Sequence, residues 1–183
     1  TQLILDNLID LKEDGSFRLN LDYFSYHKGM NITNKKFHDL FGGPPRMPET
    51  TITKREMDIA TSIQRVTEKV ILSITGFLAK ETNEKNLCMA GGVALNCVAN
   101  TKILQSSYFD NIWIQPAAGD AGGALGAALA ANYIHFNNNR KVKKPDSMNF
   151  ALLGPDYNDD ECEEILTQEG AIYNKMEESD LIS

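Results

Sequence analysis

The stretch NLCMAGGVALNCVANTKILQSSYFDNIWIQPAAGDAGGALGAALAANY, residues 86–133, decides how this sequence folds. It contains two glycine pairs, at 91–92 and 122–123, and a carboxylate, Asp120, whose immediate neighbours are all small residues. Each pair follows a short apolar run and precedes a segment with helical spacing, so each is expected where a strand passes into a helix. Ligands of α/β proteins bind at the carboxyl ends of strands, so these turns are candidates for a binding site.

The segments around the two turns predict alternating helices and strands. A capping box at Thr53 and Glu56 predicts a helix that keeps one apolar face to residue 79. The elements expected after it are a short buried strand, a helix, a strand and a helix, at 86–90, 93–104, 111–116 and 121–136. This order favours an α/β layer in which helices cover a sheet.

The first fifty residues predict a mixture of short elements. Helical spacing is expected over residues 1–11, a turn at 14–15 and an alternating strand at 17–21. Residues 42–49, GGPPRMPE, are predicted to form a rigid loop, because their glycines and prolines exclude regular structure.

The sequence changes character after residue 138. Residues 139–150 are rich in Asn and Lys, and their basic cluster at 140–144 favours a solvated linker over a binding patch. Residues 151–183 contain a capped helix that ends at Gly170, which we interpret as the first helix of a further, incomplete domain. The predicted organisation is therefore a domain over 1–138, a linker over 139–150 and the beginning of another domain over 151–183.

Composition indicates an ordinary globular protein, with 42% apolar and 23% charged residues. The net charge of −7 weighs against unaided binding to nucleic acid or to an anionic membrane. No apolar run approaches the roughly 20 residues of a membrane span, and no signal peptide opens the chain. The three cysteines form no CxxC pair, so a reducing cytoplasm is expected, with Cys88 and Cys97 as small buried hydrophobic residues.

Both the glycine pairs and the acid have a purely structural alternative. One glycine pair alone favours a tight turn or close helix packing, whereas two pairs with Asp120 between them favour a binding site. Asp120 is suited to cap the helix that follows it or to bind a cation, and the two roles are compatible. Asn96 is expected one turn into the helix at 93–104, where a surface position and a ligand-facing position are both open.

Several other kinds of site are excluded. GDAGGALG matches the dinucleotide fingerprint only loosely, and no strand with a terminal acid follows about 20 residues later. A P-loop is absent, and the three histidines have no metal-ligand spacing.

The residues LCMAGGVALNCVANTKIL and FDNIWIQPAAGDAGGALGAALAA closely resemble the ATP-dependent O-carbamoyltransferases of the nodulation-protein and antibiotic-tailoring type. PPRMPET before them and LLGPDY after them are similar to that family as well, so the resemblance covers roughly residues 15–170. It implies an α/β fold: the second half of an actin- and sugar-kinase-like ATPase domain over 1–138, akin to the tRNA threonylcarbamoyl-transfer protein. Residues 151–183 would begin a YrdC-like domain.

The resemblance also implies a two-step reaction. Carbamoyl phosphate and ATP would give carbamoyl adenylate in the smaller domain, and the large domain would pass the carbamoyl group to a hydroxyl of a sugar or antibiotic scaffold. By position, the nucleotide would bind at Gly91, Gly92 and Asn96. We expect Gly119, Gly122 and Gly123 to line the same nucleotide site. Asp120 would be catalytic, as a ligand of a divalent metal, an iron or similar ion, with magnesium as the alternative.

The HxxxH motif that supplies the family's other metal ligands does not occur in this sequence. The chain is therefore expected to be a piece of a longer protein, inactive by itself, with the N-terminal half and most of the C-terminal domain as its partners. Two alternatives stay open: carbamoylation of tRNA or of a maturation factor, and a non-catalytic nucleotide-binding module.

Overall fold

The computed structural model describes residues 1–144, 146–148 and 151–181. The chain divides into two compact units, Thr1–Asn138 and Asn139–Ser183. The predicted linker includes residues 145, 149 and 150, and the predicted last domain includes residues 182 and 183, all of which lie outside the described residues. No helix in the described part of the chain is long and apolar enough to cross a membrane.

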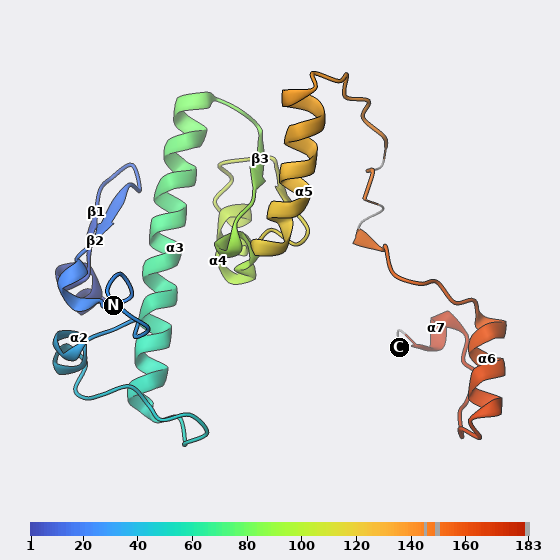
Figure 1. Ribbon diagram of the computed structural model, residues 1–183, viewed down its shortest axis with the longest axis horizontal. Helices are drawn as coiled ribbons and strands as arrows, with labels where there is room; N and C mark the ends of the chain where they lie inside the picture. Colours follow the sequence, from blue (N-terminus) through green and yellow to red (C-terminus); the bar gives the residue numbers. More distant parts are fainter. Residues whose placement is uncertain (145, 149–150, 182–183) are drawn as a thin grey trace. The chain divides into compact units, whose positions relative to one another are not determined.

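The first unit is a mixed α/β structure with small sheets (Figure 1). Its elements are α1 (Gln2–Asn7), β1 (Ile9–Leu11), β2 (Phe17–Leu19), η1 (Leu21–Tyr23), α2 (Lys35–Leu40), α3 (Lys54–Thr82), β3 (Asn86–Met89), η2 (Gly92–Leu95), α4 (Cys97–Gln105), β4 (Asn111–Ile114), α5 (Asp120–Ala130) and the π-helical turn η3 (Ala131–His135). The second unit contains α6 (Asp159–Gln168) and α7 (Glu178–Leu181).

The long helix α3 organises the first unit, and Figure 1 shows it between the N-terminal elements and α4. One hydrophobic cluster joins it to the first forty residues and consists of Ile4, Leu8, Tyr23, Val66 and Val70. A second cluster joins it to α4 and the β3–β4 sheet and consists of Ile71, Ala99, Ile103 and Phe109. Because α3 contributes to both clusters, it fixes the position of the sheet that carries the glycine turns.

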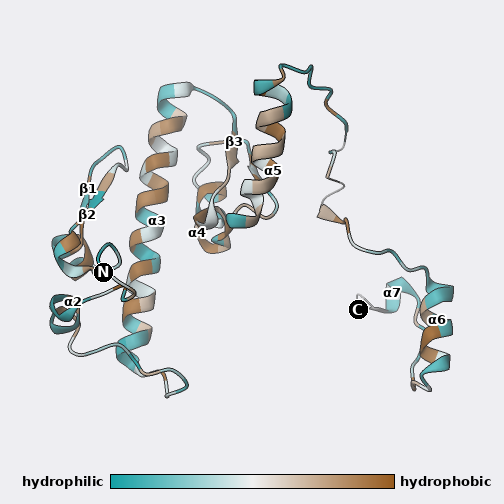
Figure 2. Ribbon diagram, viewed as in Figure 1, coloured by the Kyte–Doolittle hydropathy of each residue, from teal (hydrophilic) through white to brown (hydrophobic). Residues whose placement is uncertain are grey.

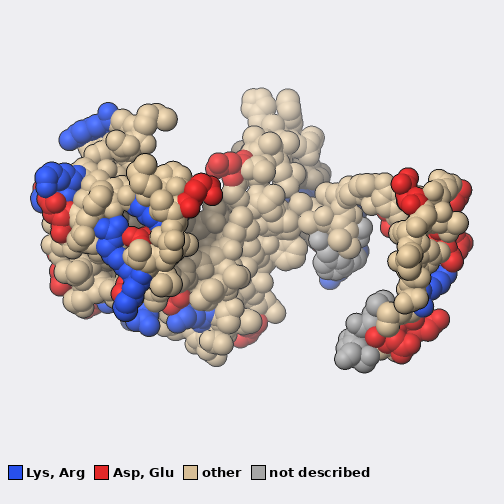
Figure 3. Space-filling model, turned by 90° about the horizontal axis from the view of Figure 1, so that it is seen from below, with Lys and Arg blue, Asp and Glu red and all other residues tan. Residues whose placement is uncertain are grey.

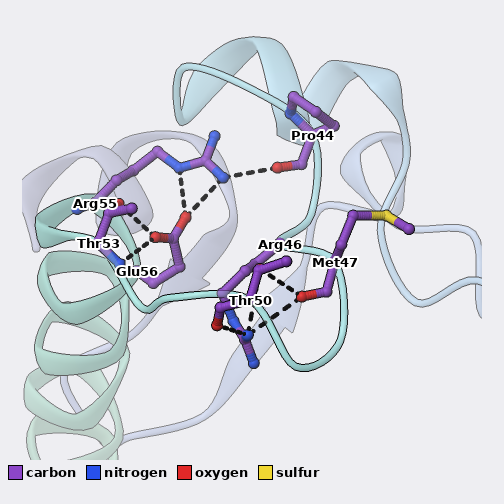
Figure 4. A network of polar contacts seen from close by, with 7 residues as sticks. All are labelled: Pro44, Arg46, Met47, Thr50, Thr53, Arg55 and Glu56. Carbon is purple, nitrogen blue, oxygen red and sulfur yellow. Dashed lines mark hydrogen bonds and ion pairs between the residues drawn. The ribbon is translucent and has the colours of Figure 1, made fainter.

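The start of α3 confirms the predicted capping box (Figure 4). The Thr53 N–H donates to Glu56 Oε2 at 2.9 Å, and the Thr53 hydroxyl accepts from the first turn. Arg55 binds Glu56 and also donates to the carbonyl of Pro44 at 2.7 Å, so the irregular loop at 42–49 is tied to the helix. The hydrogen bonds from Thr53 and Arg55 lower the pKa of Glu56 from 4.5 to about 2.

β3 and β4 pair in parallel, from Asn86 opposite Asn111 to Met89 opposite Ile114, with α4 as the crossover. Both strands were predicted, but the prediction that β3 is buried is wrong. Alternate residues of β3 are exposed, because within the described residues this sheet has only two strands. Cys88, in β3, and Cys97, the first residue of α4, are both exposed, against the sequence prediction.

The N-terminal prediction was right in part. The turn at residue 15 is present between β1 and β2, which pair antiparallel. The helix predicted over 1–11 ends at Asn7, however, because residues 9–11 pair with β2 and backbone hydrogen bonds to a neighbouring strand replace those of a helix.

The second unit, described by itself, contains the predicted capped helix. Asn158 and Glu161 form a capping box at the start of α6, and Gly170 follows its end with φ of +63°. The residues described between Asn139 and Met148 form neither helix nor strand.

Candidate functional site

The first glycine turn directly follows β3. Gly91 has φ of +95°, a backbone conformation that strongly favours glycine. A Cβ added at Gly91 or at Gly92 would have no other atom within 4 Å, so the space beside both residues is open. After it, residues 92–95 form the 3-10 turn η2, and α4 starts only at Cys97.

The two glycine turns lie against each other at the carboxyl ends of β3 and β4. The Gly91 N–H donates to the carbonyl of Ala118 at 2.8 Å. The position of a Cβ on Gly119 lies 3.9 Å from the Cα of Gly92. The structure therefore brings Gly91, Gly92 and Gly119 together, although they are up to 28 residues apart in the sequence.

Asp120 is the first residue of α5, and the N-cap position belongs to Gly119. Its side chain is exposed and makes no hydrogen bond or ion pair with any residue that the structure describes. The alternative in which Asp120 caps the helix is therefore not what the structure contains. The carboxylate lies in the first turn of α5, where the helix dipole favours negative charge, and it is free to meet a ligand.

Gly122 and Gly123 lie inside the first turn of α5 and not in the preceding loop. A Cβ on Gly122 would lie 2.4 Å from the carbonyl oxygen of Ala117, so this glycine allows the turn after β4 to approach the helix closely. A Cβ on Gly123 would have no other atom within 4 Å. The pair therefore divides: Gly122 serves close packing, whereas Gly123 faces open space.

Asn96 is the N-cap of α4, so the prediction that it lies one turn inside a helix is wrong. The error arises because residues 92–95 have the spacing of a helix but form the 3-10 turn η2. Asn96 Oδ1 accepts a hydrogen bond from the N–H of Ala99 at 3.0 Å. The same side chain exchanges two hydrogen bonds with Gln64 of α3, at 2.9 and 3.1 Å.

Gln64 belongs to a polar group that sequence reasoning missed. It donates to Glu68 at 3.0 Å, and Glu68, which is only 7% exposed, forms an ion pair with Lys102 of α4 at 2.9 Å. The hydrogen bond from Lys102, followed by that from Gln64, lowers the pKa of Glu68. The signal in the sequence was a pair of polar residues four apart on the otherwise apolar side of the helix.

The 3-10 turn is held by a second asparagine. Asn100 Nδ2 donates to the carbonyl of Ala94 at 2.7 Å, while Asn100 Oδ1 is buried without a hydrogen bond to any described residue. The turn that follows the first glycine pair is thus fixed by side chains from α4, and through Asn96 by α3.

The described residues do not form a metal site. No group of three or more His, Cys, Asp and Glu side chains lies close enough to hold an ion among them. Asp120 alone supplies one carboxylate, and tetrahedral or octahedral metal sites need more ligands than that. A metal bound to Asp120 would require further ligands from outside the described residues.

A hollow of about 870 Å³ lies along α3, but it contains none of the predicted site residues. Its lining includes Arg65, Lys69, Ser73, Lys80 and Tyr108. The predicted site is instead an exposed surface at the edge of the β3–β4 sheet, where Gly91, Gly92 and Asp120 are all exposed.

Charged side chains of both signs cover the first unit, and Figure 3 shows Lys and Arg next to Asp and Glu on the face in view. Several form exposed ion pairs, among them Lys36 with Asp22 and Lys54 with Asp58. Such exposed pairs are screened by water and salt, so they add little to stability.

Comparison with known proteins identifies the family of this chain. Residues 1–129 match the protein family described as Carbamoyltransferase N-terminus. The chain is 55% identical to the protein sll1178 of Synechocystis over 181 residues, which are 98% of the chain and 29% of that protein.

Two nodulation proteins are also similar. NolO of Bradyrhizobium diazoefficiens is 33% identical over 85% of the chain and 26% of its own length. NolNO of Sinorhizobium fredii is 33% identical over 69% of the chain and 17% of its own length. The chain spans less than a third of the length of each of these relatives, and it belongs to the carbamoyltransferase family.

Proposed function

We propose that this chain is part of a carbamoyltransferase that uses carbamoyl phosphate and ATP to carbamoylate a hydroxyl group of a small molecule. Water would first cleave carbamoyl phosphate into carbamate and inorganic phosphate, and a carbamate oxygen would then attack the α-phosphorus of ATP to give carbamoyl adenylate and pyrophosphate. Attack of the acceptor hydroxyl on the carbamoyl carbon would release AMP. The first unit would be the second half of an actin- and sugar-kinase-like domain. The second unit would begin a YrdC-like domain.

The observation that supports this proposal most strongly is the contact between the two glycine turns in a chain of this family. Gly91 and Gly119 lie at the ends of adjacent parallel strands, and the turn at Gly119 leads directly into α5. The first N–H groups of a helix lack intrahelical partners and attract phosphate groups, and no side chain caps the start of α5 among the described residues. Exposed glycine backbone allows a nucleotide to come close, which any side chain at these positions would hinder.

Asp120 would act beside the nucleotide phosphates. In this proposal it contributes one ligand to a divalent cation whose other ligands come from outside the described residues. The exposed and unpartnered carboxylate supports that role, because no internal contact competes for it.

The test uses the protein encoded by the whole reading frame that contains this sequence, and the present chain as a comparison. Each is incubated with ATP, a divalent metal salt and carbamoyl phosphate, and the release of pyrophosphate and AMP is followed with and without carbamoyl phosphate. We expect release that depends on carbamoyl phosphate from the complete protein and none from this chain. Robust turnover by this chain alone would contradict the proposal that it is inactive without the rest of the protein.

Site variants sharpen the test. Asp120→Ala should reduce acceptor carbamoylation at least ~100-fold, the range seen when a single charge-stabilising group is removed from an active site. Asp110→Ala, which removes another exposed acid of the first unit, should leave the rate within about twofold. ATP binding without release that depends on carbamoyl phosphate would instead favour a nucleotide-binding module or an enzyme that acts on a macromolecule.

A further inference from the structure

The hydrogen bonds around Asn96 determine which way its side-chain amide points. A backbone N–H is always a donor, so the atom of Asn96 that lies 3.0 Å from the Ala99 nitrogen must be the oxygen. The amide nitrogen therefore faces the other way and donates to Gln64 Oε1 at 2.9 Å.

The orientation of Gln64 is fixed independently from its other side. An ionised carboxylate only accepts hydrogen bonds, so the atom of Gln64 that lies 3.0 Å from Glu68 Oε1 must be the amide nitrogen. Glu68 stays ionised because it is paired with Lys102 at 2.9 Å. Both ends of the network thus impose the same arrangement, and reversing either amide would place two donors or two acceptors against each other.

In this arrangement the side chain of Asn96 keeps an unused hydrogen-bond donor but no unused acceptor. Its Oδ1 accepts from both Ala99 and Gln64, which occupies the two lone pairs of a carbonyl oxygen. Its Nδ2 carries two protons and donates one of them to Gln64. The remaining proton has no hydrogen bond to any described residue, so Asn96 has a donor to offer but no acceptor.

We propose that Gln64 is a positioning residue that holds Asn96 as a hydrogen-bond donor to a phosphate oxygen of the bound nucleotide. This inference rests on the proposed function, since it concerns the same nucleotide site. Asn96 directly follows η2, and its backbone N–H donates to the carbonyl of Val93, so its position is tied to the turn that contains the first glycine pair. Glu68, paired with Lys102, holds Gln64 in the orientation in which Gln64 both donates to Asn96 and accepts from it.

The experiment measures the Kd of ATP and of adenosine by calorimetry with the protein from the whole reading frame. Asn96→Asp keeps an oxygen that caps α4 but replaces the donor by a negative charge. We expect this variant to raise the Kd of ATP at least tenfold and the Kd of adenosine less than threefold, because adenosine has no phosphate. Gln64→Met, of similar length but without an amide, should weaken ATP about threefold to tenfold and adenosine much less.

The matched control is Gln105→Met, at an exposed position in the last turn of α4 whose side chain makes no hydrogen bond with the described residues. Its affinities should equal those of the unaltered protein. Equal loss of ATP and adenosine affinity in Asn96→Asp and Gln64→Met would mean a merely structural role and would overturn the inference, as would an unchanged ATP affinity in Gln64→Met. If the unaltered protein binds no ATP, the proposed function is wrong, and this inference, which depends on it, is wrong as well.

Discussion

The helices α3 and α5 differ in how their apolar side chains are accommodated within one unit. Along α3, apolar and polar residues alternate, and Figure 2 shows both colours along its ribbon. Val66, Val70 and Ile71 are buried there. Helix α5 consists almost entirely of small and apolar residues, yet none of its residues is buried, and Leu129 is 46% exposed.

The difference teaches that amphipathic spacing identifies a helix whose partners lie in the same unit. The apolar side chains of α3 pack into two hydrophobic clusters, and the other members of both clusters also belong to the first unit. A helix that is apolar on all sides is typical of a fully covered position. The described residues supply α5 with no such cover, so its sequence is suited to surroundings that this unit by itself does not contain.

The largest expected effect comes from truncating one apolar side chain on each helix. Ile71→Ala should lower the free energy of unfolding by about 2–4 kcal/mol, because it removes buried methyl groups from the cluster with α4. Leu129→Ala should change it by less than about 0.5 kcal/mol, as is usual for exposed positions. Urea denaturation of the chain measures both.

The same two variants made in the protein from the whole reading frame extend the comparison. If α5 is covered there, the cost of Leu129→Ala should approach that of Ile71→Ala. A cost below about 0.5 kcal/mol in both proteins would show that α5 stays exposed, against the expectation from its composition.

A smaller change in the free energy of unfolding is expected when either of the two adjacent glycines of α5 is replaced by alanine, and its sign differs between them. Gly122→Ala should destabilise the chain by about 1–3 kcal/mol, because its methyl group would lie within 2.4 Å of the Ala117 carbonyl and force the turn to move. Gly123→Ala should stabilise it by about 0.5–1 kcal/mol, since alanine favours a helix and the position is open.

ATP affinity gives the second measurement on these glycines. If Gly123 approaches the nucleotide, Gly123→Ala should weaken ATP in the complete protein although it raises the melting temperature. Unchanged ATP affinity would show that Gly123 does not approach the nucleotide.

The smallest effect concerns pH at the start of α3. The pKa of Glu56 is lowered from 4.5 to about 2, so its ionised form stabilises the folded state above pH 4.5. That contribution is lost as the pH falls from 4.5 towards 2, because the unfolded chain then binds a proton that the folded chain does not. The melting temperature of Glu56→Gln should therefore lie below that of the unaltered chain at pH 6 and approach it near pH 2.

Glu81→Gln, which removes an exposed carboxylate at the other end of α3, is the control. If the difference in melting temperature between Glu56→Gln and the unaltered chain stayed constant from pH 6 to pH 2, the capping box would not act through the charge of Glu56.

Much of the first unit could be predicted from local patterns. The capping box at Thr53, the extent of α3, both parallel strands and the loop at 42–49 depend on neighbouring residues, and each was found where it was expected. The family was also correctly identified from the glycine turns and the residues around them.

The errors share a physical cause. The burial of β3 and of Cys88 was inferred from apolar character, but burial depends on which other elements cover a segment. Asn96 was placed inside a helix because 3-10 and α turns use similar residues over a few positions, and a cap is recognisable only once the helix start is known.

The sequence by itself determined the main helices and strands from α3 to α5, their order, the family and the two glycine turns, because all of these depend on residues that are close together along the chain. The tertiary structure decided how the turns meet, which of the glycines serve packing, and which way the amide of Asn96 points. Those features depend on Gln64, Glu68 and Ala118, which come from other elements, and hydrogen bonds between distant residues form only after hydrophobic packing has brought their elements together.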